Sequence, residues 1–149
     1  MQARCIARLK KEADDINKNF VGVLELQVLD DSWMKWHIKF TGAEGTVYAG
    51  EPYCLQFKFN NEYPIDSPEV IFVGTPPKHE HIYSNGFICL SILYSEWSPA
   101  LKVSSVCMSI LSMMSSAKEK KGPPNDSSSG LSHYKSPKDV SWMFEDDKC

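Results

Sequence analysis

The sequence lacks the features that mark membrane, secreted and metal-scaffold proteins. No apolar run approaches 18 residues, and residues 1–15 carry charges where a secretory signal would have a hydrophobic core. The five cysteines are an odd number and include no Cys-x-x-Cys pair. A disulfide scaffold or a structural zinc site is therefore not expected. A reducing compartment, cytoplasmic or nuclear, is expected instead.

An excess of basic charge is also missing. The formal net charge is −3, so the chain has no broad positive field that would attract nucleic acid or an anionic membrane surface. We expect neither as a partner. What is present fits one soluble domain, because 149 residues that are 42% hydrophobic and 23% charged can build a single core.

Apolar side chains recur at helical spacing in two segments. The first predicts a short amphipathic helix over residues 4–16, with a stripe of Ile6, Leu9, Ala13 and Ile16. The second is a wider stripe over residues 103–114, which predicts a helix buried against a sheet. No N-cap residue is evident before it. The run 118–124 should end it, with cations in the last turn and Gly-Pro-Pro after them.

Between these segments apolar residues alternate with polar ones, as in half-buried strands. Such alternation favours an antiparallel sheet with one face in water. The expected strands cover residues 24–28, 35–40, 53–59 and, in shorter form, 70–73. A helix, a meander of four strands and a long second helix make an α+β fold.

The composition changes after residue 121. Ser, Pro, Asp and Lys dominate from Gly122 onward without a sustained period, so we expect a core domain over 1–121 and a flexible tail over 122–149. Trp142, Met143 and Phe144 are unusual in such a tail. They either dock on the domain or bind a partner.

The candidate chemistry lies in residues 78–97, KHEHIYSNGFICLSILYSEW. Cys89 follows an Asn-Gly turn and precedes an apolar run, which would display its thiol at the edge of the fold. It could be a buried structural cysteine, a nucleophile with His79 or His81 as base, a zinc ligand or a redox thiol. Zinc is poorly supported because no fourth ligand is evident, and redox chemistry because no resolving cysteine is near.

A longer pattern surrounds this stretch and resembles the ubiquitin-conjugating enzyme (E2) family over about residues 8–116. It consists of Tyr63-Pro64, Ser67-Pro68, His79-x-x-Ile82-x-Ser84-Asn85-Gly86-x-Ile88-Cys89-Leu90-x-Ile92-Leu93 and Trp97-Ser98-Pro99-Ala100. The resemblance implies the family fold of helix, four-stranded meander and second helix. It also implies that Cys89 accepts ubiquitin, or a similar modifier, from an E1 as a thioester. A RING-type E3 would then help to pass the modifier to an amine.

The resemblance also implies that the E2 itself needs no metal or cofactor, since ATP and magnesium belong to the E1 step. It assigns His79 a structural role. His81 falls where most E2s have an asparagine that stabilises the oxyanion or the loop. A neutral histidine can donate one N–H and so fill either role, and general base is the alternative.

Two positions bear on which amine is accepted. Many lysine-modifying E2s have an aspartate two residues after the cysteine and another past the second helix, where this chain has Ser91 and Lys121. An α-amine has a pKa of about 7.7–8.0 against about 10.4 for lysine, so it is uncharged a few hundred times more often at neutral pH. A site without those carboxylates suits an α-amine better.

This agrees with one branch of the family, the W-type E2s, which modify flexible substrate N-termini. The CLSIL run, the His-x-His motif, the Pro-Pro-Asn-Asp segment and the aromatic-acidic ending resemble that branch, although Glu80 replaces its usual proline. The alternatives are a lysine-directed E2 for ubiquitin or a related modifier, and a silent ubiquitin-binding scaffold. The cysteine argues against the scaffold, because such variants generally lack it.

The resemblance further implies a surface for E1 and E3 partners, formed by the first helix and two loops. Its residues are Arg8, Lys11, Tyr63, Pro64, Ile65, Pro99 and Ala100. Ordinary surface charge and loop stiffening explain the same residues without a partner.

Overall fold

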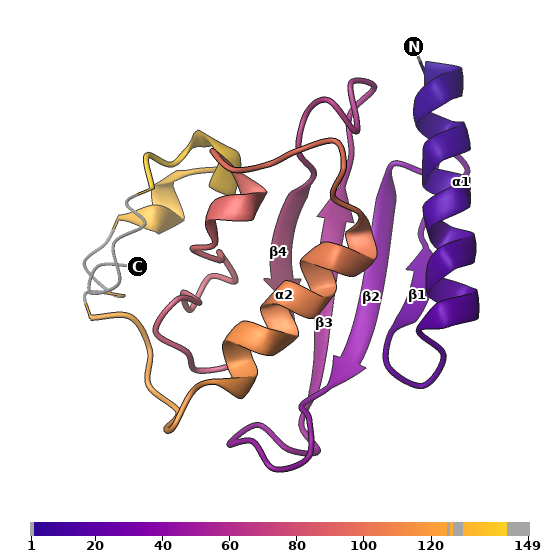
Figure 1. Ribbon diagram of the computed structural model, residues 1–149. Coiled ribbons are helices and arrows are strands. Elements are labelled where there is room, and N and C mark those ends of the chain that lie inside the picture. The colour runs from indigo at the N-terminus through magenta and orange to yellow at the C-terminus, as the bar shows by residue number, and fades with distance from the viewer. Residues whose placement is uncertain (1, 125, 127–129, 143–149) are drawn as a thin grey trace.

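The computed structural model describes residues 2–124, 126 and 130–142. The chain runs through an N-terminal helix, four consecutive strands and a second long helix, with short 3₁₀ helices in the connecting segments (Figure 1). The main elements are α1 (Gln2–Asn19), β1 (Glu25–Val28), β2 (Lys35–Thr41), β3 (Pro52–Lys58), β4 (Glu69–Val73) and α2 (Val103–Ser115). This is the α+β plan that the periodicity predicted.

The four strands form one antiparallel meander in the order β1-β2-β3-β4. Alternate residues of β2 and β3 face the core, and their partners on the other face are partly or fully exposed. In register, Trp36 lies opposite Phe57 and Ile38 opposite Leu55, all four completely buried. The alternation in the sequence arises because successive side chains point to opposite faces of a strand.

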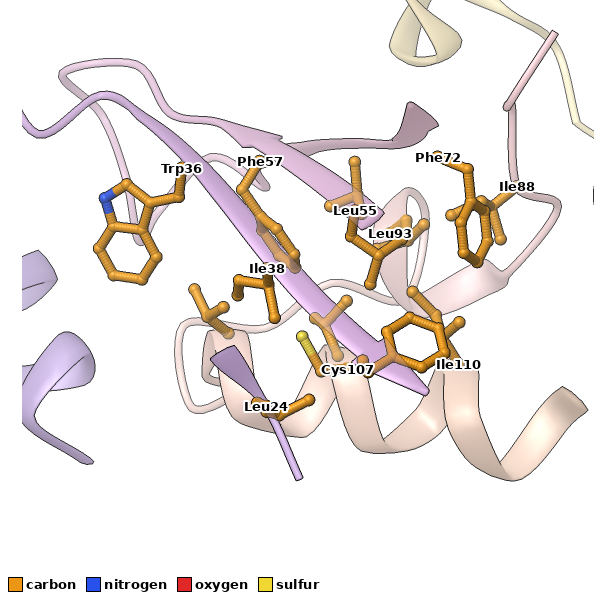
Figure 2. Packing of buried hydrophobic residues seen from close by; sticks show 14 of the residues in the cluster. Leu24, Trp36, Ile38, Leu55, Phe57, Phe72, Ile88, Leu93, Cys107 and Ile110 are labelled. Carbon is orange, nitrogen blue, oxygen red and sulfur yellow. The ribbon is translucent and has the colours of Figure 1, made fainter. Parts of the chain in front are cut away.

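Helix α2 crosses one face of the sheet, and α1 lies beside β1 at the sheet edge (Figure 1). Figure 2 shows Cys107 and Ile110 of α2 among the core-facing side chains of the sheet, with Leu93 beside Leu55. The predicted stripe of α2 is confirmed, since Val103, Val106, Cys107, Ile110 and Met114 are all buried.

Two details of the helices differ from the prediction: where α2 ends and which face of α1 is buried. Helix α2 ends at Ser115, so the cations from Lys118 onward lie beyond its last turn. The buried face of α1 is centred on Cys5, Leu9, Glu12 and Ile16, and Ile6 is only partly buried. The stripe therefore contains a carboxylate, Glu12, which is only 3% exposed.

The segment after β4 is held against that strand by backbone contacts. Gly86 O accepts from Phe72 N–H at 2.9 Å, and Phe87 forms an isolated bridge with Ile71. Gly86 has φ +93°, and a Cβ there would collide with the carbonyl of Phe72. Only glycine permits this close approach, which places the Cys89 loop beside the sheet.

The described part of the C-terminal segment packs on the domain. Pro137 is buried, and Lys138 Nζ donates to Ser67 O at 2.7 Å and pairs with Asp66 at 3.1 Å. The ring of Trp142 stacks on Tyr94 at a centroid distance of 5.3 Å. Of the two roles considered for Trp142, docking is therefore the one observed.

The predicted boundary at 121 and the predicted flexibility beyond it stay predictions. Met143, Phe144 and the acidic ending lie outside the described residues. Within residues 2–124, 126 and 130–142, no helix combines the length and the apolar character needed to cross a membrane.

Candidate active site

Cys89 lies in the loop between β4 and α2, anchored by buried neighbours on both sides. Ile88 and Leu93 are fully buried, and Figure 2 shows both in the core. The N–H of Cys89 donates to His81 O at 2.8 Å, which brings these two residues together across eight positions of sequence. The side chain of Cys89 is itself only 4% exposed. The predicted displayed thiol is therefore not observed, because Cys89 is buried and disulfide-bonded in this structure.

Two tyrosine hydroxyls hold this loop at either end. The Tyr48 hydroxyl donates to Lys78 O, at the start of the loop, and the Tyr94 hydroxyl donates to Ile88 O at 2.9 Å. Burial raises the pKa of both phenols above the ordinary value of 10.0, so both stay protonated donors over the physiological range. Sequence reasoning missed these two contacts because tyrosine at an apolar position reads simply as core.

His79, for which the resemblance implies a structural role, is buried and hydrogen-bonded through both ring nitrogens. Its side chain is 6% exposed, with Nε2 lying 3.1 Å from Met113 O and Nδ1 accepting from His81 N–H at 3.0 Å. These two bonds require the neutral tautomer with the proton on Nε2. Burial lowers the pKa of His79 below its ordinary value of 6.5, which keeps the ring in that neutral form.

His81 is oriented by His79 and lines a pocket at the end of α2. The two rings lie 5.4 Å apart between centroids. The pocket has a volume of about 370 Å³ and is also lined by Glu80, Lys118 and Glu119. His81 therefore lines a pocket with charged residues, and its backbone carbonyl binds Cys89 N–H. A larger pocket of about 960 Å³, lined by residues of α1 and of all four strands, includes none of the predicted catalytic residues.

Ser91 begins a short 3₁₀ helix (Ser91–Leu93) directly after the cysteine. Its carbonyl accepts from the N–H groups of Tyr94 and Glu96, both at 3.0 Å, and its hydroxyl donates to Glu96 Oε2 at 2.7 Å. The Glu96 carboxylate therefore lies beside Ser91, the position where many lysine-modifying E2s have an aspartate. Sequence reasoning missed Glu96, since a turn had to fold it back by five residues.

The predicted partner surface is organised by the buried carboxylate of Glu12. It accepts from Arg8 Nε at 2.8 Å, from the Tyr63 hydroxyl at 2.6 Å and from Val103 N–H at 2.7 Å. Helix α1, the Tyr63 loop and the N-terminus of α2 thus meet at one group, and a carboxylate at a helix N-terminus is electrostatically favourable. The sequence signal that could have revealed the burial of Glu12 is its position three residues after Leu9 and four before Ile16, on the apolar face of the helix.

The other members of that surface divide into structural and exposed residues. Arg8 donates to Pro99 O at 2.9 Å and to Leu101 O at 3.0 Å, so its guanidinium joins α1 to the loop before α2. Tyr63 is 2% exposed, and Pro64 O accepts from Trp97 Nε1 at 2.8 Å. The exposed residues are Lys11, Ile65, Pro99 and Ala100, with Ile65 at 70% exposure.

Comparisons with known proteins agree with this architecture. The family model described as "Ubiquitin-conjugating enzyme" matches residues 8–139. The chain is 56% identical to the probable ubiquitin-conjugating enzyme E2 W of Dictyostelium discoideum, with 99% of each chain covered. It is 51% identical to the ubiquitin-conjugating enzyme E2 W of Caenorhabditis elegans, with 95% of this chain and 91% of the relative covered.

A solved structure supports the same assignment. The ubiquitin-conjugating enzyme E2 UbcA1 from Agrocybe aegerita aligns with a TM-score of 0.80 at 40% identity, covering 90% of this chain and 98% of that one. Identity at this level over nearly whole chains carries the enzyme class as well as the fold. The chain belongs to the ubiquitin-conjugating enzyme family, as an E2 transferase of the W type.

Proposed function

We propose that this E2 accepts ubiquitin from an E1 as a thioester on Cys89 and transfers it to α-amino groups of flexible substrate N-termini. The observation that carries the proposal is the hydrogen bond from Cys89 N–H to His81 O. It holds the cysteine beside the histidine that replaces the usual asparagine.

The other described cysteines are poor nucleophiles. Cys5 and Cys107 are buried, and Cys54 is partly buried on the outer face of β3. Burial raises the pKa of all three thiols above 9.0. Since the thiolate is the reactive form, a raised pKa makes each of them inert at neutral pH. Among the described cysteines, thioester chemistry is therefore best assigned to Cys89, once its disulfide has been reduced.

The transfer step needs an amine, a leaving thiolate and a donor for the oxyanion. The amine nitrogen forms a bond to the thioester carbonyl carbon, and the carbonyl oxygen carries negative charge until the C–S bond breaks. The proton lost from nitrogen returns to the Cys89 sulfur, directly or through water. His81, oriented from behind by His79, supports either the oxyanion through an N–H or the loop itself.

The acceptor assignment rests on basicity. Neither position where lysine-modifying E2s have an aspartate carries one here: Ser91 offers a hydroxyl, which donates to the Glu96 carboxylate, and Lys121 is exposed beyond the end of α2. An α-amine already has a substantial uncharged fraction at neutral pH, with its pKa of about 7.7–8.0, and so depends less on a base than lysine does. A second candidate function, lysine modification, keeps the same thioester and differs only in the amine.

Partner binding follows the exposed part of the predicted surface. We assign E1 and RING-type E3 contacts to Ile65, Pro99, Ala100 and Lys11, with Arg8, Tyr63 and Pro64 shaping that surface from beneath. An apolar side chain as exposed as Ile65, flanked by proline, is typical of a contact surface. The enzyme itself would need no metal or cofactor, and would act in the cytoplasm or nucleus.

The test of acceptor choice is a discharge experiment. The thioester-charged enzyme is offered free lysine in one reaction and a short peptide with a free N-terminus and blocked lysines in the other. We expect faster discharge by the peptide. Discharge by lysine alone would overturn the N-terminal proposal and favour the lysine-directed alternative. A chain that never acquires ubiquitin from an active E1 would instead be a silent scaffold.

The role of His81 is tested in the same assay. His81→Asn restores the amide donor found in most E2s, whereas His81→Ala removes the donor. We expect His81→Asn to discharge near the parental rate and His81→Ala to be slower by about tenfold or more. Loss of a full oxyanion donor typically slows an enzyme by about 100-fold to 1,000-fold. Equal rates for all three proteins would exclude a catalytic role for this side chain.

A further inference from the structure

The side chain of Glu96 is folded back onto Ser91, two residues from the cysteine. Its Oε2 accepts from Ser91 Oγ at 2.7 Å, while its N–H donates to Ser91 O at 3.0 Å. Both a side-chain and a backbone hydrogen bond therefore determine where the carboxylate lies. Few exposed glutamates are held at two points in this way, since most rotate freely.

The backbone directs this carboxylate toward the side of the chain that carries the thiol. Leu90, between Cys89 and Ser91, has an extended conformation with φ −145° and ψ 116°. In an extended chain the side chains two residues apart point to the same side. Two residues span at most about 7 Å, so the Glu96 carboxylate lies on the order of 10 Å from the Cys89 backbone.

Glu96 forms no ion pair with any residue that the structure describes, and its side chain is exposed. Its one side-chain partner, Ser91, is uncharged and leaves the remaining lone pairs accessible. The exposed Glu96 carboxylate therefore places one negative charge beside Ser91, where an approaching cation would meet it.

We propose that Glu96, held by Ser91, is a specificity-determining residue that attracts the protonated amine of the acceptor to the thioester. The proposal deepens the function proposed above and rests on it. Amine substrates arrive mainly as ammonium ions, whereas water and other neutral nucleophiles gain nothing from a carboxylate. Glu96 would thus favour transfer to amines over loss of ubiquitin by hydrolysis.

The chemical step is unchanged by this attraction. The bound ammonium gives one proton to water, its nitrogen forms the C–N bond as the C–S bond breaks, and the second proton restores the Cys89 thiol. Glu96 acts before this step, by raising the local concentration of the amine. Its removal should therefore raise the KM for amines and leave the maximal rate unchanged.

The test compares Glu96→Gln with the parent at about pH 7.5, using a peptide with a free N-terminus as the cationic substrate and hydroxylamine as a neutral one. An exposed charge pair is worth about 0.2–1 kcal/mol, so we expect the KM for the peptide to rise about 1.5-fold to 5-fold. Discharge by hydroxylamine should not change. High salt should remove the difference for the peptide as well.

Three variants control for structure. Glu25→Gln removes the same charge from β1, at the opposite edge of the sheet from β4, and should leave both substrates unaffected. Glu96→Asp keeps the charge and should fall between the parent and Glu96→Gln. Ser91→Ala releases the carboxylate and should change the KM in the same direction, by less. An equal slowing of peptide and hydroxylamine by Glu96→Gln would show a structural role and overturn the proposal.

A second measurement does not depend on ubiquitin loading. In a Cys54→Ala background, the protein is first reduced and then freed of reductant. Cys89 is treated with a cationic and with a neutral methanethiosulfonate, and labelling of its peptide is followed by mass spectrometry under non-reducing conditions. We expect Glu96→Gln to lower the ratio of cationic to neutral rates by a similar factor. An unchanged ratio would contradict the proposal, whatever amine the charged enzyme prefers.

Discussion

The hydroxyl of Tyr63 donates to the carboxylate of Glu12 across 2.6 Å, joining the loop after β3 to the first helix. The same carboxylate binds Arg8 and the first N–H of α2, at Val103. Burial, and next the neighbouring Glu12 charge, raise the pKa of Tyr63, so its hydroxyl remains a donor. One buried group therefore determines how the predicted partner loops sit against α1.

Removal of this carboxylate should destabilise the protein. Glu12→Ala leaves the Tyr63 hydroxyl and the Val103 N–H buried without an acceptor, and each such group costs about 1–3 kcal/mol. We expect the free energy of unfolding to fall by about 3 kcal/mol in urea denaturation. Asp14→Ala, on the exposed side of the same helix, should change it by less than about 0.5 kcal/mol. Equal effects of the two variants would disprove the bridging role.

The close approach at Gly86 gives a second stability prediction. Gly86→Ala would place a Cβ against the Phe72 carbonyl and also strain a backbone with φ +93°. Gly45 has a similar φ of +79° with nothing within 4 Å of a Cβ, so Gly45→Ala should cost only the backbone term of about 1–2 kcal/mol. We expect Gly86→Ala to lose clearly more stability and to slow ubiquitin loading as well. Equal losses of stability in the two variants would show that the close approach of Gly86 to Phe72 of β4 does not require glycine.

Stability should depend on pH through His79. Its pKa is lowered in the folded protein from an ordinary 6.5, because burial disfavours the charged ring. The unfolded chain therefore binds the proton more readily, and stability that is full above about pH 6.5 is lost as the pH falls. We expect the free energy of unfolding to decrease between pH 7.5 and 5.5, and the decrease to be smaller in His79→Gln. An identical pH dependence in the two proteins would exclude His79 as its source.

The docked Trp142 should limit access to Cys89. Trp142 lies 5.3 Å from Tyr94 and 5.8 Å from Tyr83, and Tyr94 in turn binds Ile88 O next to the cysteine. Aromatic contacts of this kind are worth about 0.5–1.5 kcal/mol, so their loss should expose the loop about twofold to tenfold more often. We expect Trp142→Ala to speed alkylation of Cys89 by that factor under reducing conditions. Tyr134→Ala, an exposed aromatic in the same segment, serves as the control and should have no effect.

Periodicity predicted the order and type of every main element, because both amphipathic helices and half-buried strands record which face meets the core. β2 begins at Lys35 as predicted and ends one residue later than predicted, whereas α1 extends three residues past Ile16. The family resemblance, rather than periodicity, identified Cys89, His79 and His81 as a unit.

The residues that escaped prediction act through contacts that the sequence pattern around them does not reveal. Glu12 binds Val103 across 91 positions, and Lys138 reaches Ser67 across 71. Glu96 needed a specific turn to reach Ser91. The burial of Cys89 was missed for the same reason, since the sequence beside a cysteine says little about the segments that fold over it.

The most direct test of the account is ubiquitin loading by E1 and ATP. The parent should form an adduct that a thiol reductant removes, Cys89→Ala should form none, and Cys89→Ser should form an ester that resists the reductant. Cys54→Ala should load like the parent, since its thiol lies on the outer face of the sheet. An adduct on Cys89→Ala, or no adduct on the parent with an active E1, would contradict the assignment of Cys89 as the ubiquitin carrier.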